Sequence, residues 1–281
     1  MRASRPAAHR HEAPYAGACG PSHHMMTRFL SLLSRRLMPC LCAMLACMTQ
    51  QAAASVVISG TRVIYPAGDR EITVKIDNNG TLPSLVQAWL DDGDVHSRPG
   101  TATVPFVMMP PISRIDPGKG QTLRIVYTGD PLPQDRESVF WLNVLDIPPK
   151  VDESSTTTAL QLAFRTRIKL FFRPVGLDAD GAVAAAKQLK WSVVPAPGGD
   201  GHALRATNAS PFNVTVLSAR VAHGGRTYGT VDGAMVAPGQ SHVFPLDAPL
   251  PALPGRTKLD YSTINDFGAG VEWQSSIDAT P

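Results

Sequence analysis

The chain has 281 residues, with 26 Lys and Arg against 23 Asp and Glu, and four cysteines of which Cys47 is the last. This length suits two domains of ordinary size, and a chain without later cysteines must rely on its hydrophobic cores. Much of the basic excess lies before Ser55 and the remainder is slightly acidic, so nucleic-acid binding is not expected.

Residues 1–54 have the layout of a leader that is removed on secretion. Arginines precede an apolar run over residues 37–48, and alanines ending at Ala54 follow it. This order of regions predicts a signal peptide cleaved after Ala54. The apolar run is shorter than the roughly 20 residues that span a bilayer, so an anchoring helix is less favoured. Lipid modification of Cys47 is the other, weaker alternative.

Short alternating runs separated by Gly, Pro and Asn turns follow from Ser55 onward, and this pattern predicts β-strands. The runs expected as strands in the first part are 55–68, 70–80, 82–94, 121–130 and 138–149, with a Pro-rich passage at 106–120 and a polar loop at 150–158.

The run 158–174 is longer than a typical strand of about 5–6 residues. Its apolar side consists of Leu160, Leu162, Phe164, Ile168, Leu170 and Phe172, and its polar side of Gln161, Arg165, Arg167, Lys169 and Arg173. A strand with one apolar and one basic face is predicted, and its apolar face needs a cover.

After Pro174 the composition shifts, with a short helical turn expected within 182–191. Strands are then predicted within 202–208, 212–221, 234–246 and 259–274. The regular spacing predicts an all-β chain of two tandem β-sandwich domains, at 55–174 and 175–281.

Motifs of enzymes are absent from the sequence. No G-x-S-x-G elbow, phosphate-binding Gly loop or H-E-x-x-H is found. The four histidines after Ser55 are widely separated, which favours surface positions over a metal site. Asp91, Asp92 and Asp94 lack the closing Glu of a calcium loop, so a solvated turn is expected. We predict a protein that is not an enzyme and needs no cofactor or metal.

Two cations on predicted strands are candidates for binding a carboxylate. Arg62 shares the parity of Val56, Ile58 and Ile64, which places an arginine among inward-facing aliphatic side chains. Lys169 lies on the polar side of the long run. From spacing alone, ordinary solvated strand residues are the favoured interpretation of both.

Five blocks resemble, in order, the motifs of the periplasmic pilus chaperones, the PapD-like family. They are PPISRIDPG, LPQDRESVFWLNVLDIPP, IKLFFRP, NASPFNVTV and YSTINDFG, and they extend over nearly the whole chain after the leader. The resemblance implies two immunoglobulin-like sandwiches in a boomerang arrangement. It also implies a periplasmic protein that lends a strand to incomplete fimbrial subunits and delivers them to an outer-membrane usher.

The resemblance also implies roles for individual residues. Arg62 and Lys169 match the cations that anchor the subunit's C-terminal carboxylate. The donor side chains are expected at Leu160, Leu162 and Phe164, while Ile168 to Phe172 should pack in the chain's own core.

Glu137, Arg173 and Asp266 match the family's salt bridge between the two domains. A disulfide often found in the family's second domain has no counterpart here. Exposed donor strands also imply a self-capping homodimer.

Two alternatives remain at this point. A structural fimbrial subunit or adhesin would show one incomplete sandwich and an exposed alternating N-terminal extension. A hydrolase built on a β-sandwich would require clustered catalytic or metal-binding groups.

Overall fold

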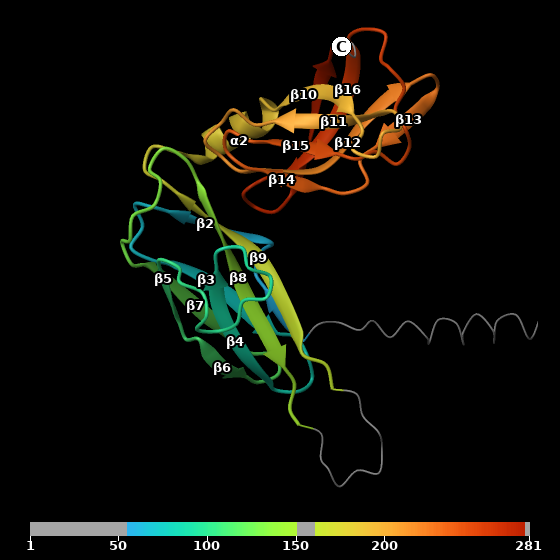
Figure 1. The fold of residues 1–281 in the computed structure, drawn as a ribbon. Helices are drawn as coiled ribbons and strands as arrows, with labels where there is room; N and C mark the ends of the chain where they lie inside the picture. The colour runs from blue at the N-terminus through green and yellow to red at the C-terminus, as the bar shows by residue number, and fades with distance from the viewer. Residues whose placement is uncertain (1–54, 151–160, 279–281) are drawn as a thin grey trace, which may run out of the picture. The chain divides into compact units, whose positions relative to one another are not determined.

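The computed structural model describes residues 55–150 and 161–278. Within these ranges the chain forms strands β1 to β17 and the helix α2 (Ala179–Lys187), as Figure 1 shows. The predicted all-β class is therefore confirmed. No helix in the described ranges has the length and hydropathy needed to cross a membrane.

Two sheets form the first part of the described chain. One has the order β1 (Val56–Ile58), β3 (Ile72–Asn78), β7 (Gly120–Tyr127), β5 (Phe106–Met109). The other has the order β2 (Arg62–Pro66), β9 (Phe164–Arg173), β8 (Ser138–Ile147), β4 (Ser84–Asp91), β6 (Ile112–Ile115). Apolar side chains of both sheets pack into one core, in which Tyr65, Ile76, Leu123, Leu142 and Leu170 are fully buried. The two sheets therefore form a sandwich.

The run 55–68 is two strands rather than one. Gly60 has a φ of +107°, a conformation that favours glycine, and the chain changes sheet there. β1 pairs with β3 in one sheet, and β2 pairs with β9 in the other. Alternation predicted the strand conformation but not the sheet to which each half belongs. The Pro-rich passage likewise contains β5 and β6, which lie in different sheets.

Strand β9 is shorter than expected, because it begins at Phe164 rather than Thr158. Its pairing with β8 starts at Asp146↔Phe164, and β8 is followed by Pro148 and Pro149. Prolines have no N–H to donate, so the ladder cannot continue along them. The Gln161 side chain donates to both proline carbonyls, at 2.9 and 2.8 Å.

The second part of the described chain forms two further sheets. One has the order β10 (Lys190–Pro195), β11 (His202–Thr207), β15 (Ser241–Phe244). The other has the order β13 (Arg226–Gly229), β12 (Val214–His223), β16 (Thr257–Ile264), β17 (Gly270–Ile277), with β14 (Ala234–Val236) also paired to β12. Their shared core contains Trp191, Phe244 and Tyr261.

The expected helical turn is a helix of nine residues, α2. The Asp178 carboxylate caps its first turn by accepting from the Gly181 amide at 2.7 Å. Ala185 and Ala186 are buried in the second core, and the Tyr261 hydroxyl donates to the Ala186 carbonyl at 3.0 Å. The two cores belong to one compact unit of the chain.

Candidate functional site

The two predicted anchoring cations are neighbours on paired strands. β2 and β9 run parallel, and Arg62 is the direct partner of Lys169 in their register. Val63 and Leu170, the next residues on each strand, are buried in the first core. Because side chains alternate across a strand, Arg62 and Lys169 share the opposite face. The expectation that Arg62 points inward is therefore wrong, since Val63 and Tyr65 occupy that side.

Both cations are partly buried, and neither forms an ion pair with a carboxylate of the described residues. Arg62 donates from Nη1 to the Ile264 carbonyl at 3.1 Å, and its buried Nε has no hydrogen-bond partner among the described residues. The Lys169 ammonium lies 5.0 Å from the centre of the Trp141 ring. Neither cation has a carboxylate within 4 Å in the described ranges. An unsatisfied buried donor is costly, so an anion would be stabilised here.

The electrostatics of the pair support this interpretation. Burial lowers the pKa of Arg62, although the charges of Asp266 and Glu137 act in the opposite direction. Burial, followed by repulsion from Arg62 and Arg167, lowers the pKa of Lys169. A bound carboxylate would reverse both effects, because it favours the charged forms of its neighbours.

The predicted donor residues lie where the strand is least covered. Leu160 falls outside the described residues. Leu162 precedes β9 and is 52% exposed, and Phe164, the first residue of β9, is 53% exposed. Along the same face, Leu170 and Phe172 are buried in the core. The apolar row therefore changes from exposed to buried along its length.

One edge of β9 is also open over part of the strand. From Lys169 to Phe172, β9 lies between β2 and β8, but residues 164–168 pair with β8 alone in the described structure. Their second backbone edge is free to hydrogen-bond another strand. The exposed side chains and the open backbone edge thus occur in the same half of β9. We call residues 164–168 the donor edge.

The third predicted set is brought together as an ion network. Arg173 donates from Nε to Glu137 at 2.8 Å, and from Nη1 and Nη2 to Asp266 at 2.7 and 3.0 Å. Glu137 also accepts from the backbone and side-chain amides of Asn213, at 2.8 and 3.3 Å. Burial opposes the charge of Arg173, but its bonds to Asp266 and the charge of Glu137 raise its pKa. The network links strands of the first core to residues beside the second.

A second polar network contains a residue whose environment was predicted wrongly. Asp91 was expected in a solvated turn with Asp92 and Asp94, yet it is fully buried, while the other two are exposed. The difference arises because Asp91 is the last residue of β4, and its carboxylate meets Arg167 of β9. The alternating arginines of β9 indicated in the sequence that a carboxylate could be paired with this strand. The strand order was needed to identify that carboxylate as Asp91.

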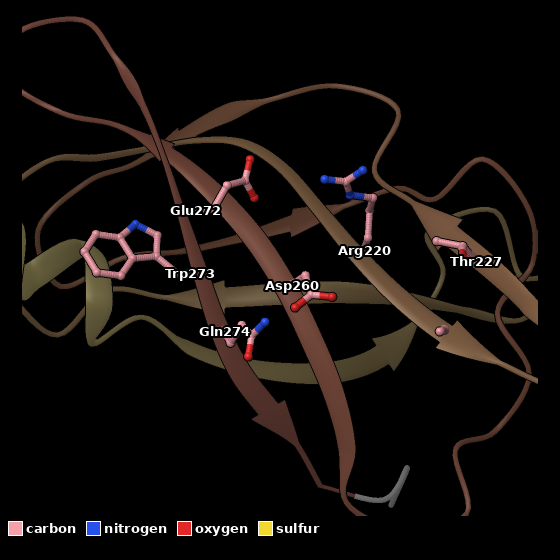
Figure 2. A pocket seen from close by; sticks show the side chains of 7 residues that line it. Arg220, Thr227, Asp260, Glu272, Trp273 and Gln274 are labelled. Atoms are coloured by element: carbon pink, nitrogen blue, oxygen red, sulfur yellow. The ribbon is translucent and has the colours of Figure 1, made fainter.

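A hollow of about 740 Å³ in the described structure lies elsewhere (Figure 2). It is lined by Arg220, Ala222, Thr227, Asp260, Glu272, Trp273 and Gln274. Figure 2 shows Arg220, Asp260 and Glu272 on three neighbouring strands, which are β12, β16 and β17. None of the predicted site residues lines it. The described residues also contain no cluster of His, Cys, Asp and Glu suited to a metal ion.

Comparison with known proteins identifies the family. The model "Pili and flagellar-assembly chaperone, PapD N-terminal domain" matches residues 55–178. The model "Pili assembly chaperone PapD, C-terminal domain" matches residues 184–275.

Individual relatives agree with these matches. The probable fimbrial chaperone YadV of Escherichia coli is 44% identical over 80% of this chain and 90% of its own length. The chaperone FimB/FhaD of Bordetella pertussis is 43% identical over 84% and 93%.

Solved structures agree as well. The YadV crystal structure has a TM-score of 0.66 at 41% identity, covering 79% of this chain and all of that one. The Salmonella enterica SafB chaperone, solved with the SafA pilin, has a TM-score of 0.64 at 28% identity over 80% and 97%. The relatives are named chaperones, so the prediction of a non-enzymatic protein is confirmed, and the chain belongs to the PapD-like family of pilus assembly chaperones.

Proposed function

We propose that this protein is a periplasmic chaperone that completes fimbrial subunits by donor-strand complementation and delivers them to an outer-membrane usher. In this proposal residues 1–54 are a removed leader, and 55–174 and 175–281 are the two chaperone domains. The structure of SafB with the SafA pilin supports subunits as the partner class. A structural subunit or adhesin is the alternative, and the named relatives do not favour it.

The observation that carries the proposal is the Arg62–Lys169 pair beside the donor edge. Two partly buried cations without a carboxylate partner in the described ranges suit the C-terminal carboxylate of a subunit. Fixing that terminus would set the register in which the subunit's last strand pairs with β9. The exposed side chains of Leu162 and Phe164, with Leu160 before them, would then enter the subunit's apolar groove.

The Glu137–Arg173–Asp266 network is assigned a structural role in this proposal. A buried ion pair contributes little net stability but is costly to break. We therefore propose that the network fixes the orientation of the two domains. Free chaperone is further proposed to cover its donor edge by forming a self-capping dimer.

The test is co-expression of the chaperone with the fimbrial subunits encoded in its own genome, followed by co-purification from the periplasm. Arg62→Ala and Lys169→Ala should lose subunit capture and remain folded. Arg124→Ala and Lys75→Ala are matched controls, because these strand cations already have carboxylate partners, Glu71 and Asp77. If all four variants capture subunits equally, the anchoring roles are wrong. If the unaltered chain captures none, the chaperone function itself fails.

A further inference from the structure

A buried carboxylate lies at the end of β4, on the face of the sheet opposite the core. Asp91 has no exposed surface. Its two oxygens accept hydrogen bonds from the Gly93 amide at 2.8 Å, the Ser97 hydroxyl at 2.9 Å and the Asn143 side-chain amide at 2.7 Å. These bonds hold the carboxylate in one orientation, from the loop after β4 and from β8.

Two arginines of the donor edge converge on this carboxylate. Arg167 donates from Nε to one oxygen of Asp91 at 3.2 Å and from Nη2 to the other. Arg165 places its Nη2 3.7 Å from Asp91 and donates to Oδ1 of the Asn143 side chain from Nε and Nη2, at 3.0 and 2.7 Å. Such forked, charge-assisted contacts restrict geometry as well as contributing energy.

Two tryptophan rings contact the same arginines. The Arg165 guanidinium lies 4.8 Å from the centre of the Trp89 ring, and that of Arg167 lies 4.0 Å from the Trp141 ring. Cation–π contacts of this kind stabilise both guanidinium groups beside the rings. Through these contacts, the two arginines of the donor edge interact with β8 and with β4, the strand beyond β8.

The donor edge is the part of β9 that needs this support. Within the described residues, 164–168 have one strand neighbour, whereas Lys169 to Phe172 have two. A strand with one neighbour frays more readily and its register is less firmly specified. A slip of one residue would turn Phe164 to the other face, where it could not act as a donor side chain.

We infer that Asp91 is a positioning residue of the donor edge. By holding Arg165 and Arg167, its buried carboxylate keeps residues 164–168 in register as an ordered strand whose outer edge remains open to a subunit. The role of this strand in binding a subunit rests on the proposed function. The ordering of residues 164–168 by Asp91 concerns the free chain and does not depend on that function.

Hydrogen exchange on the full mature chain tests the inference. Asp91→Asn should raise amide exchange of the protected positions within 164–168 by at least tenfold, since charged hydrogen bonds are lost. Exchange in β3 and β12 should stay unchanged. Asp91→Glu, which keeps the charge, should recover part of the protection. Glu71→Gln is the matched control, because it neutralises a carboxylate bound to Arg124 in the other sheet.

Arg165→Gln decides the question if Asp91→Asn does not fold. Arg165 is more exposed than Arg167, and its loss leaves Asp91 paired. Exchange within 164–168 should rise severalfold, and capture of the co-expressed subunits should fall at unchanged global stability. Unchanged exchange at 164–168 in folded Asp91→Asn or in Arg165→Gln would overturn the inference. If the unaltered chain captures no subunit, the proposed function is refuted. The exchange result would still decide whether Asp91 orders residues 164–168.

Discussion

Phe164 and Phe172 lie on the same strand and the same face, so one substitution made at both separates a donor side chain from a core side chain. Phe172 is 1% exposed, and its ring stacks on that of Tyr65, with the centres 5.8 Å apart, and lies tilted against that of Tyr127, with the centres 4.6 Å apart. Phe172→Ala should therefore lower the free energy of unfolding by about 3–5 kcal/mol.

Phe164 is 53% exposed, so about half of its apolar surface is already covered in the free chain. Fully burying a Phe side chain contributes about 1.5–3 kcal/mol. The part buried in the free chain and the part left for the complex therefore contribute about 1 kcal/mol each. Phe164→Ala should therefore cost about 1 kcal/mol of stability. It should also weaken subunit binding by about fivefold to tenfold, because the other half is buried in the complex.

Urea unfolding of the two variants measures the stability difference, and titration of the captured subunit measures binding. Phe172→Ala should lose more stability than Phe164→Ala. Phe164→Ala should lose more subunit affinity than Phe172→Ala when binding is measured per folded molecule. Equal loss of stability in both variants would place Phe164 in the chain's own core and refute its donor role. Unchanged binding by Phe164→Ala would refute it as well.

Three further predictions concern the donor segment and the two ion networks. Leu162→Glu should abolish pilus assembly while leaving the free chain folded, because a charge would enter an apolar groove; normal assembly would contradict the donor assignment. Arg173→Met should cost about 3–5 kcal/mol in urea unfolding, since Glu137 would remain buried and unpaired, and adding Glu137→Gln should recover part of that loss. Burial opposes the charge of the Asp91 carboxylate, but the hydrogen bonds it accepts outweigh burial and lower its pKa. Its contribution to stability is therefore fully present well above the ordinary pKa of about 3.9 and is lost as pH falls through the lower folded value. The difference in unfolding free energy between the unaltered chain and Asp91→Asn should be constant from about pH 5 to 8 and should begin to narrow below about pH 4; a difference that does not narrow in acid would contradict this.

The sequence by itself determined the strand content and the family. Alternation with a period of two depends only on local geometry, so most strands were located from it. The motif blocks are likewise local, and the family resemblance they carry identified the residues of the Arg62–Lys169 pair and of the Glu137–Arg173–Asp266 network. Residue types and order were sufficient for these conclusions because neither requires knowledge of which strands are adjacent.

Only the tertiary structure decided which partners those residues meet. Arg62 bonds a carbonyl 202 positions away, and Asp91 meets Arg167 across 76 positions. A period of two assigns a residue to a face but not to a sheet, a neighbour or an edge. The burial of Asp91, the outward direction of Arg62 and the start of β9 opposite two prolines all depend on strand order. That order arises from packing among distant segments, which no local pattern records.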